Sequence, residues 1–227
     1  MWALLPLKDF ASAKQRLIGT LNSKQRICLL DAMANDVLRV LGSHPDLDGT
    51  LVVSSDPIAR QLARRYAVDF VSESELGAQG LNPVVQAGTV CLAQRGIAEV
   101  LIIHGDLPLV THAEIGQIIR HHRCAPQPTL TIATDRHDDG TNGLLCPTGS
   151  ALSFGYGKGS CRWHQDQARA SGMACDVMIL PGMSCDIDEP DDLLVFLNHP
   201  NLATAVCTRD YLAASGIVRQ LHAQEDV

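Results

Sequence analysis

The run Val100-Leu101-Ile102-Ile103-His104-Gly105-Asp106-Leu107-Pro108-Leu109 joins a continuous apolar segment to an acidic turn. An apolar, largely β-branched run without alternation predicts a strand that is buried on both faces. Gly105 and Pro108 predict that the strand ends there and the chain turns. Ligands bind beyond the carboxyl ends of such strands in open α/β sheets, so Asp106 has a position typical of functional residues. Its carboxylate suits Mg²⁺, although a turn-capping role explains it equally well.

Apolar runs and helical patterns alternate along the rest of the chain. We expect strands at residues 2–7, 50–53, 68–71, 99–103, 129–134, 143–146, 176–180 and 185–187. We expect helices at 23–41, 57–66, from the loop 77–83 to about 94, at 111–122, 160–171, and from 190 and about 209. This alternation predicts an α/β protein with three layers, α/β/α, around a mostly parallel mixed sheet. No linker or repeat interrupts it, so we expect one domain over residues 1–227.

Composition narrows the class of protein. Hydrophobic residues make up 46% and charged residues 19% of the 227 residues, which is typical of a globular protein. The net charge of −7 argues against a nucleic-acid or anionic-membrane surface, because both are bound through basic patches. The 8 cysteines form no C-x-x-C pair and are expected to be free thiols. With no signal peptide and no long apolar run, we expect a soluble, cytoplasmic protein; a homodimer is left open.

A second acidic signal lies in the acidic segment, residues 184–193. Asp186 and Asp188 are two apart, and in an extended chain they would point to the same side. Together with Asp106 they could form a carboxylate cage for one or two Mg²⁺ ions. The neighbouring Glu189, Asp191 and Asp192 are better explained as first-turn residues of the following helix. The alternative is that the whole segment is only a helix start.

The basic loop, residues 8–17, follows the first expected strand. Lys8, Lys14 and Arg16 could offer cations to a nucleoside triphosphate at that place. The Gly-x-x-x-x-Gly-Lys pattern of a Walker A loop is absent. A solvated basic loop is the competing explanation.

The glycine loop, residues 154–160, precedes an expected helix whose first N–H groups we expect to be free. Its glycines would let an anion approach, and Ser160 could donate its hydroxyl or simply cap the helix. Thr141 and Asn142 place a hydroxyl and an amide in a polar turn, which ordinary turn chemistry also explains. His164 could face the same pocket, but a surface position explains it more simply.

These motifs, taken in order, resemble the guanylyltransferases of coenzyme F-420 biosynthesis. The motifs that carry the resemblance are Leu5-Pro6-Leu7-Lys8, Ala13-Lys14-Gln15-Arg16-Leu17, Gly80-Leu81-Asn82, Gly105-Asp106-Leu107-Pro108, Asp139-Gly140-Thr141-Asn142, Phe154-Gly155 through Gly159-Ser160, and Asp186-Ile187-Asp188 with Pro190. Each motif is weak alone, whereas the ordered set, from Leu5 to Leu193, is fairly specific.

The resemblance implies a fold and a reaction. The fold would be that of the nucleotide-diphospho-sugar transferase and molybdenum-cofactor guanylyltransferase group. The reaction would move GMP from GTP to the phosphate of 2-phospho-L-lactate, phosphoenolpyruvate or 3-phospho-D-glycerate and release pyrophosphate, with Mg²⁺ as cofactor. GTP and the phosphorylated three-carbon acid would be the partners, with no nucleic acid and no membrane involved.

The resemblance also assigns roles to residues. Those for metal binding are Asp106, Asp186 and Asp188, with Asp186 either a direct ligand or a support for the other two. Those for the acid are Thr141, Asn142, Gly157, Gly159 and Ser160, with Gly157 and Gly159 as alternatives for one contact. Those for the nucleotide are Lys8, Lys14, Leu81 and Asn82. Those for catalysis are Lys14, Arg16 and Asp106, where the two cations would balance charge on the leaving pyrophosphate.

The chain departs from the wider transferase group at its first loop. That group has a glycine-rich loop where this chain has Leu5-Pro6-Leu7-Lys8-Asp9, a feature that resembles the narrower family. Other readings stay open: a nucleotidyltransferase for a molybdopterin or a sugar phosphate, or a nucleotide-binding module without catalysis.

Overall fold

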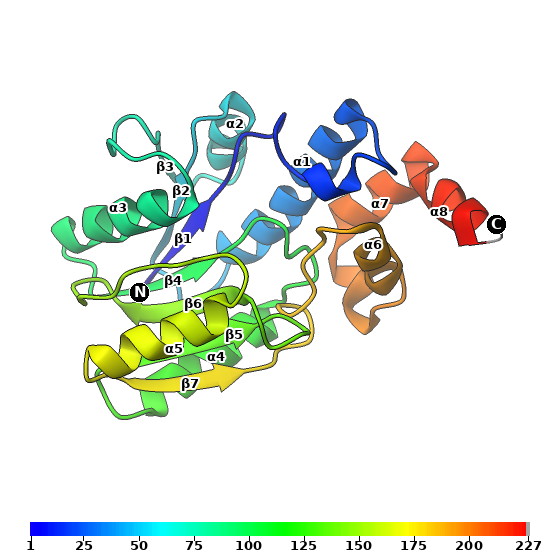
Figure 1. Ribbon diagram of the computed structural model, residues 1–227. Helices are drawn as coiled ribbons and strands as arrows, with labels where there is room; N and C mark the ends of the chain where they lie inside the picture. The colour runs from blue at the N-terminus through cyan, green and yellow to red at the C-terminus, as the bar shows by residue number, and fades with distance from the viewer. Residues whose placement is uncertain (226–227) are drawn as a thin grey trace.

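A computed structural model describes residues 1–225, and a seven-stranded sheet runs through it (Figure 1). The strands are β1 (Trp2–Pro6), β2 (Gly49–Val53), β3 (Asp69–Val71), β4 (Glu99–Ile103), β5 (Thr129–Thr134), β6 (Thr141–Pro147) and β7 (Ala174–Met178). Their order across the sheet is β3-β2-β1-β4-β6-β5-β7. The apolar run of residues 100–103 therefore lies in a central strand, as predicted.

All neighbouring strands are parallel except at β6. It runs antiparallel to both β4 and β5, with Gly143 opposite Ile103 and Pro147 opposite Glu99. The first residues of β6 therefore lie at the same edge as the last residues of β4. The predicted mostly parallel mixed sheet is confirmed.

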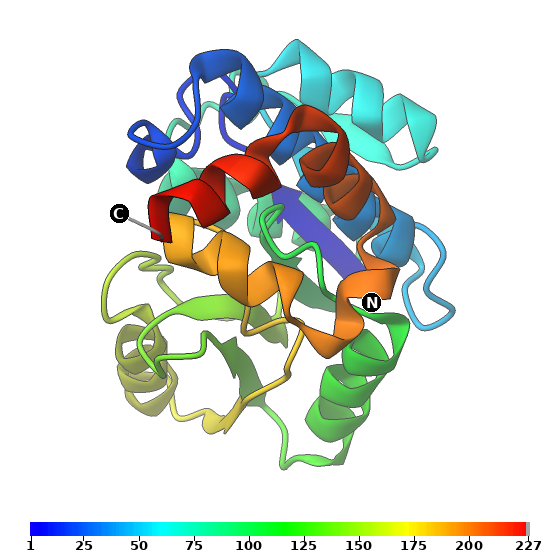
Figure 2. The same cartoon turned by 90° about the vertical axis from the view of Figure 1, so that its right-hand side faces the viewer.

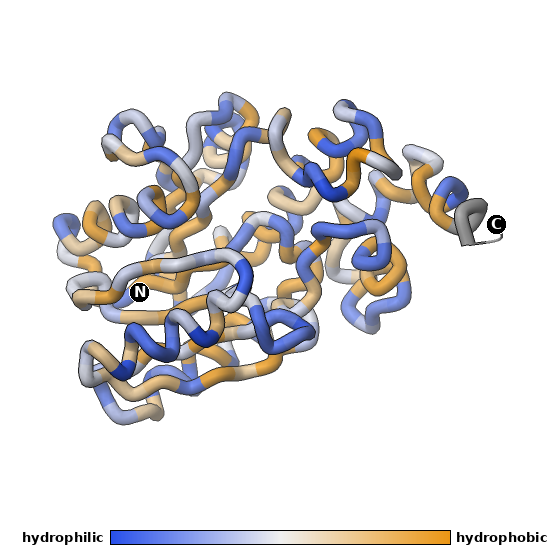
Figure 3. Tube along the Cα trace, in the orientation of Figure 1, coloured by the Kyte–Doolittle hydropathy of each residue, from blue (hydrophilic) through white to orange (hydrophobic). Residues whose placement is uncertain are grey.

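Side chains from both faces of the sheet are buried. In β1, Leu4 packs on one side, whereas Ala3 and Leu5 pack on the other, as expected for a pleated strand. The Leu4 side is covered by α3 (Leu81–Gln94) and α5 (Ser160–Ala170), and the opposite side by α1 (Ser23–Leu41), α2 (Pro57–Arg65) and α4 (His112–Cys124). Figure 3 shows the strands as largely apolar stretches between these helices. The predicted α/β/α layers are confirmed.

Polar residues start two of the covering helices. Asn22 accepts from the Gln25 N–H at the start of α1, and Thr111 accepts from the Glu114 N–H at the start of α4. Each glutamine or glutamate side chain accepts from the capping residue's own N–H in return, which completes a capping box. Of the helices in residues 1–225, none has the length and apolar character needed to cross a membrane.

The last helices lie together on one side of the molecule (Figure 2). They are α6 (Pro190–Leu197), α7 (Val206–Ser215) and α8 (Ile217–Glu225), with a 3-10 turn at Pro200–Thr204. One of them, α7, packs against α1. Asp36, buried in α1, accepts from the backbone N–H groups of Cys207 and Thr208. This capping from a distant helix starts α7 earlier than the predicted Arg209.

Three predicted strands differ from the structure. The strand expected at 143–146 is β6, which begins at Thr141, so Thr141 and Asn142 lie in a strand and the expected polar turn is wrong there. The strand expected at 176–180 is β7 and lies two residues earlier. The strand expected at 185–187 is wrong, because these residues belong to no sheet. The Ile187 N–H instead donates to the Asp106 carbonyl at 3.2 Å, so the chain is tied to the loop after β4 without entering a ladder.

Candidate active site

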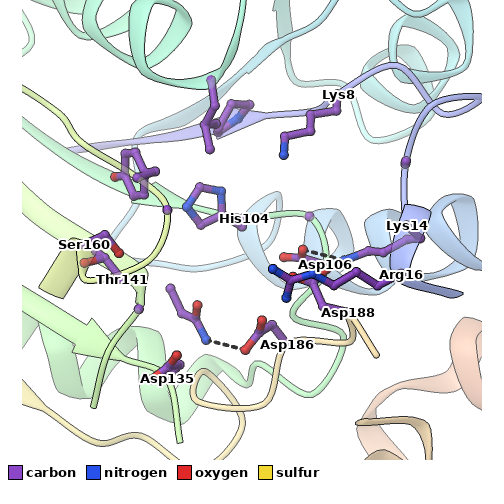
Figure 4. Close-up of a pocket in the computed structure, with 18 of the residues that line it drawn as sticks. Lys8, Lys14, Arg16, His104, Asp106, Asp135, Thr141, Ser160, Asp186 and Asp188 are labelled. Atoms are coloured by element: carbon purple, nitrogen blue, oxygen red, sulfur yellow. Dashed lines mark hydrogen bonds and ion pairs between the residues drawn. The ribbon is translucent and has the colours of Figure 1, made fainter. Parts of the chain in front are cut away.

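A cavity of about 810 Å³ opens at the carboxyl edge of β1 and β4 (Figure 4). The predicted site residues that line it are Lys8, Lys14, Arg16, Leu81, Asp106, Thr141, Asn142, Gly157, Ser160, Asp186 and Asp188. Because β6 is antiparallel, its first residues, Thr141 and Asn142, reach the same edge as Asp106. Asn82 and Gly159 are not among the lining residues.

Lys14 holds two of the three predicted metal-binding carboxylates. Its Nζ donates to Asp106 Oδ2 at 2.7 Å and to Asp188 Oδ1 at 2.6 Å. The Lys14 side chain is only 5% exposed, so this is a largely desolvated ion pair. Its backbone has φ 54° and ψ 44°, a left-handed conformation uncommon for a residue with a side chain. The chain thus bends at Lys14. From there its side chain reaches the acidic group, which consists of Asp106, Asp186 and Asp188.

The charges of this group shift its pKa values. Burial alone would lower the pKa of Lys14, but the carboxylates of Asp106 and Asp188 outweigh it and raise the pKa. Burial would raise the pKa of Asp106, but the Lys14 ammonium prevails and lowers it. The buried pair is therefore fully charged at neutral pH.

Asp186 lies beside this pair, and its pKa is shifted upward, whereas that of Asp106 is shifted downward. Its Oδ1 accepts from Asn142 Nδ2 at 3.1 Å, and the same amide donates to the Met183 carbonyl. Burial, followed by repulsion from Asp106, raises the pKa of Asp186 to about 6. Asn142 therefore orients a carboxylate here, a contact that its position in the sequence did not reveal.

The start of α6 fixes the backbone of Asp188. Asp192 accepts from the N–H groups of Asp188 and Glu189, both at 2.7 Å. Glu189 is the N-cap of α6, and Asp191 and Asp192 are in its first turn. The prediction that these three acids serve the helix start is confirmed.

Asp139 binds N–H groups of the glycine loop and of the start of α5. Asp139 accepts from Gly159 N–H at its carboxylate and from Cys161 N–H at its carbonyl, both at 3.0 Å, and the Ser160 N–H donates to Gly157. The expectation of free N–H groups at the first two residues of α5 is therefore wrong. Gly157 (φ 135°) and Gly159 (φ 72°) have conformations that favour glycine.

Ser160 lines the cavity, and its hydroxyl does not cap the helix. The N-cap of α5 is Gly159, so the capping explanation for Ser160 is wrong. Within residues 1–225 its hydroxyl has no hydrogen-bond partner, although the residue is 2% exposed and lines the cavity.

His164 is buried at 1% exposure, so its expected surface position is wrong. Its ring lies against Tyr156, and its two nitrogens contact Thr141 and Gly155. Tyr156 also packs edge-on against His104, with ring centroids 4.8 Å apart. His104 lines the cavity next to Asp106, a position that no ligand spacing in the sequence indicated.

The predicted nucleotide residues lie at two places around the cavity, Lys8 and Lys14 in the basic loop and Leu81 and Asn82 at the start of α3. Lys8 and Leu81 line the cavity, and Arg16 at its rim pairs with Glu189 at 3.2 Å. Asn82 instead accepts from the Tyr156 N–H at 2.7 Å and connects α3 to the glycine loop. Its role in nucleotide binding stays a prediction.

Comparison with known proteins shows the family to which this chain belongs. The family described as "Guanylyl transferase CofC like" matches residues 1–225. The phosphoenolpyruvate guanylyltransferase of Conexibacter woesei is 34% identical over 192 residues, which cover 85% of each chain. The 3-phospho-D-glycerate guanylyltransferase of Colwellia psychrerythraea is 30% identical over 199 residues, which cover 87% of this chain and 92% of that protein.

A solved structure confirms the predicted fold type. A protein from Desulfovibrio desulfuricans G20 that is described as a nucleotide-diphospho-sugar transferase by assignment superposes with a TM-score of 0.63 at 15% identity. The superposition covers 92% of this chain and 97% of that chain. At this identity, the similarity concerns the fold and not the function. With the family match along nearly the whole sequence, the chain belongs to the CofC-like guanylyl transferase family.

Proposed function

We propose that this chain, as one nucleotidyltransferase domain, transfers GMP from GTP to the phosphate of a three-carbon phosphocarboxylate in coenzyme F-420 biosynthesis. One observation carries the proposal: a single cavity joins an acidic group, a basic loop and two hydroxyl side chains. The relatives named above act on phosphoenolpyruvate and 3-phospho-D-glycerate, which makes these acids the first acceptors to test.

The reaction needs positioning more than it needs a base. An oxygen of the acceptor phosphate attacks the α-phosphorus of GTP, a new P–O bond forms, and the bond to the bridging oxygen breaks as pyrophosphate leaves. A phosphate dianion already carries the attacking electron pair, so no proton has to be removed. The protein's task is to align two anions and offset their repulsion. Lys8, Lys14 and Arg16 are the cations available on the lining of the cavity.

The acidic group fits a divalent cation by the chemistry of its donors. Asp106 and Asp188 both direct an oxygen at one positively charged atom, Lys14 Nζ, and Asp186 lies next to them. Carboxylates are the ligands that Mg²⁺ prefers. In residues 1–225 no three acidic, histidine or cysteine side chains already form a metal-ligand group, so Lys14 would have to release them. When bound, Mg²⁺ would offset negative charge on the α-phosphate and the attacking oxygen.

Lys14 is suited to that exchange. Its ammonium is desolvated and paired in the free protein, and a triphosphate would offer it new anionic partners. Moving from Asp106 and Asp188 to the triphosphate would keep the lysine paired and free both carboxylates.

Thr141 and Ser160 are proposed to hold the acid. Both are almost fully buried yet line the cavity. A hydroxyl donor suits the oxygens of a carboxylate or phosphate, which only accept hydrogen bonds when ionised. Two such donors on the wall away from the basic loop would separate the acid from the triphosphate.

Pyrophosphate release tests the proposal. The protein would be incubated with Mg²⁺ and either GTP or ATP, and with phosphoenolpyruvate, 3-phospho-D-glycerate or 2-phospho-L-lactate in separate reactions. We expect release with GTP and one of the acids, and much less with ATP. If GTP binds but none of these acids supports release, the acceptor assignment is wrong, and a pterin or a sugar phosphate would be tested next. Binding without release for every acceptor would indicate a non-catalytic module.

A further inference from the structure

The two ring nitrogens of His164 contact Thr141 and the glycine loop, which lie where the acid is proposed to bind. Nε2 lies 3.2 Å from the Gly155 backbone nitrogen, and Nδ1 lies 3.0 Å from Thr141 Oγ1. The imidazole is buried between β6, the glycine loop and its own helix, at 1% exposure. Both contacts are therefore shielded from water.

The Gly155 contact determines where the imidazole carries its proton. A backbone N–H can only donate, so Nε2 must accept, and a neutral ring then has its proton on Nδ1. Burial, with a smaller contribution from nearby His104, outweighs the raising effect of a contact with the Ser160 backbone and lowers the pKa of His164 to about 4, so the ring is neutral at pH 7. Nδ1–H is then the donor toward Thr141.

This arrangement leaves the proton of Thr141 available. The hydroxyl accepts from His164 and therefore does not donate to it. Among the described residues, it has no other hydrogen-bond partner, and Thr141 lines the cavity. With the opposite tautomer, Thr141 would donate to His164 and present lone pairs to an incoming anion.

We propose that His164 is a positioning residue that makes Thr141 a hydrogen-bond donor to an anionic oxygen of the acceptor acid. His164 does not touch the acid; it acts through Thr141, and Gly155 sets its tautomer. This inference rests on the proposed function for the identity of the acid. The tautomer itself does not depend on that function.

The first test is the tautomer in the free protein. Nitrogen-15 spectra of histidine-labelled protein at pH 7 distinguish protonated from unprotonated ring nitrogens, and the spectrum of His164→Gln assigns the signals. We expect His164 to be protonated at Nδ1 and unprotonated at Nε2. Protonation at Nε2 would overturn the inference. The measurement itself is made on the unaltered protein, and the variant serves only to assign the signals.

The second test is a double-mutant cycle on acceptor binding. Glutamine at position 164 can still accept from Gly155 but loses the donor at the Nδ1 position. We expect His164→Gln and Thr141→Val each to raise KM for the acid by about tenfold, with KM for GTP changed by less than about twofold. The double variant should match Thr141→Val alone, because His164 acts through that hydroxyl.

The outcomes separate this inference from the proposed function. If the enzyme is active and the effects of His164→Gln and Thr141→Val on KM for the acid are additive, the role of His164 is wrong. Equal rises in KM for both substrates would have the same meaning. Neither result would contradict the proposed function. If the wild-type protein releases no pyrophosphate with any acid, the proposed function fails and Thr141 loses its acid partner as well. His121→Gln is the matched control, because His121 is exposed on α4 and pairs only with Asp176 among the described residues; we expect both KM values to stay unchanged.

Discussion

Lys14 and its two carboxylates show how single residues define this site. Among the described residues, Asp106 and Asp188 each form their only ion pair with this lysine. Neutralising one carboxylate leaves the lysine paired with the other, whereas neutralising the lysine leaves two carboxylates without their counter-ion. For the two carboxylates, the effects of substitution should therefore appear in turnover before they appear in folding.

We expect Asp106→Asn and Asp188→Asn each to lower kcat by about a hundredfold or more, because each removes a charge that the transition state needs. Circular dichroism should show an unchanged fold, since Lys14 keeps one carboxylate partner in either variant. Asp191→Asn, exposed in the first turn of α6, is the control and should keep normal turnover. Near-normal rates for Asp106→Asn or Asp188→Asn would contradict the metal assignment.

Lys14→Met should raise KM for GTP by about tenfold or more, because one charge-assisted contact to the triphosphate is lost. KM for the acid should change less, since Lys14 lies on the other side of the cavity from the glycine loop. Lys24→Met, exposed on α1, is the matched control. Initial rates at varied GTP and at varied acid would measure both constants, and equal effects of the two lysine variants would refute the assignment.

At the scale of elements, the glycine loop depends on backbone conformation. A Cβ on Gly157 would meet nothing within 4 Å, so the glycine is required by its φ of 135° and not by lack of space. We expect Gly157→Ala to destabilise the loop by about 1–3 kcal/mol and to raise KM for the acid. Gly149→Ala, which also has open space but no left-handed φ, should be neutral. Thermal unfolding and acceptor kinetics would test both variants, and identical behaviour would contradict this explanation.

Most elements could be predicted because their signals are local. The apolar run 100–103, the Thr111 cap and Pro190 at a helix start all act within a few residues. The strand expected at 185–187 is wrong because Cys185 and Ile187 bury their side chains in the core without joining the sheet, and the Ile187 backbone bonds, among the described residues, only to the loop after β4. The start of α7 depends on a carboxylate in α1, which no local pattern could indicate.

The site could be predicted in part for the same reason. The spacing of Asp186 and Asp188 predicts that these two acids lie together, and the place of Asp106 after a strand makes it their expected partner. Spacing could not show that Lys14 would join them, that Asn142 would orient Asp186, or that His164 would be buried. Each of these depends on how distant strands are ordered, and the antiparallel direction of β6 in particular was not visible in the sequence.

At the scale of the whole molecule, acid should weaken the fold through buried histidines. The pKa of His164 is about 4 in the folded state and about 6.5 when unfolded, so the unfolded chain binds more protons between these values. The free energy of unfolding should therefore fall as pH decreases from 6.5 to 4, by up to about 3 kcal/mol from this residue. Asp186, with a pKa raised to about 6 by burial and Asp106, acts in the opposite direction.

Denaturant unfolding at several pH values, for wild type and His164→Gln, isolates the histidine contribution. The difference in unfolding free energy between the two proteins should be larger at pH 7 than at pH 4. His121→Gln should follow the wild-type curve, because its ring is exposed. A constant difference across this range would show that His164 does not resist protonation.

The reversed direction of β6 also limits where the chain can gain or lose length. β6 ends at the edge opposite the cavity, where Thr148 bonds to Ala98, so residues 148–159 must return along the sheet before α5 begins. Leu152 and Phe154 are buried along this path. A deletion there could not be absorbed by a tighter turn and would draw Ser160 out of the cavity. Among relatives, insertions and deletions should therefore be rare in this segment and more frequent in exposed turns.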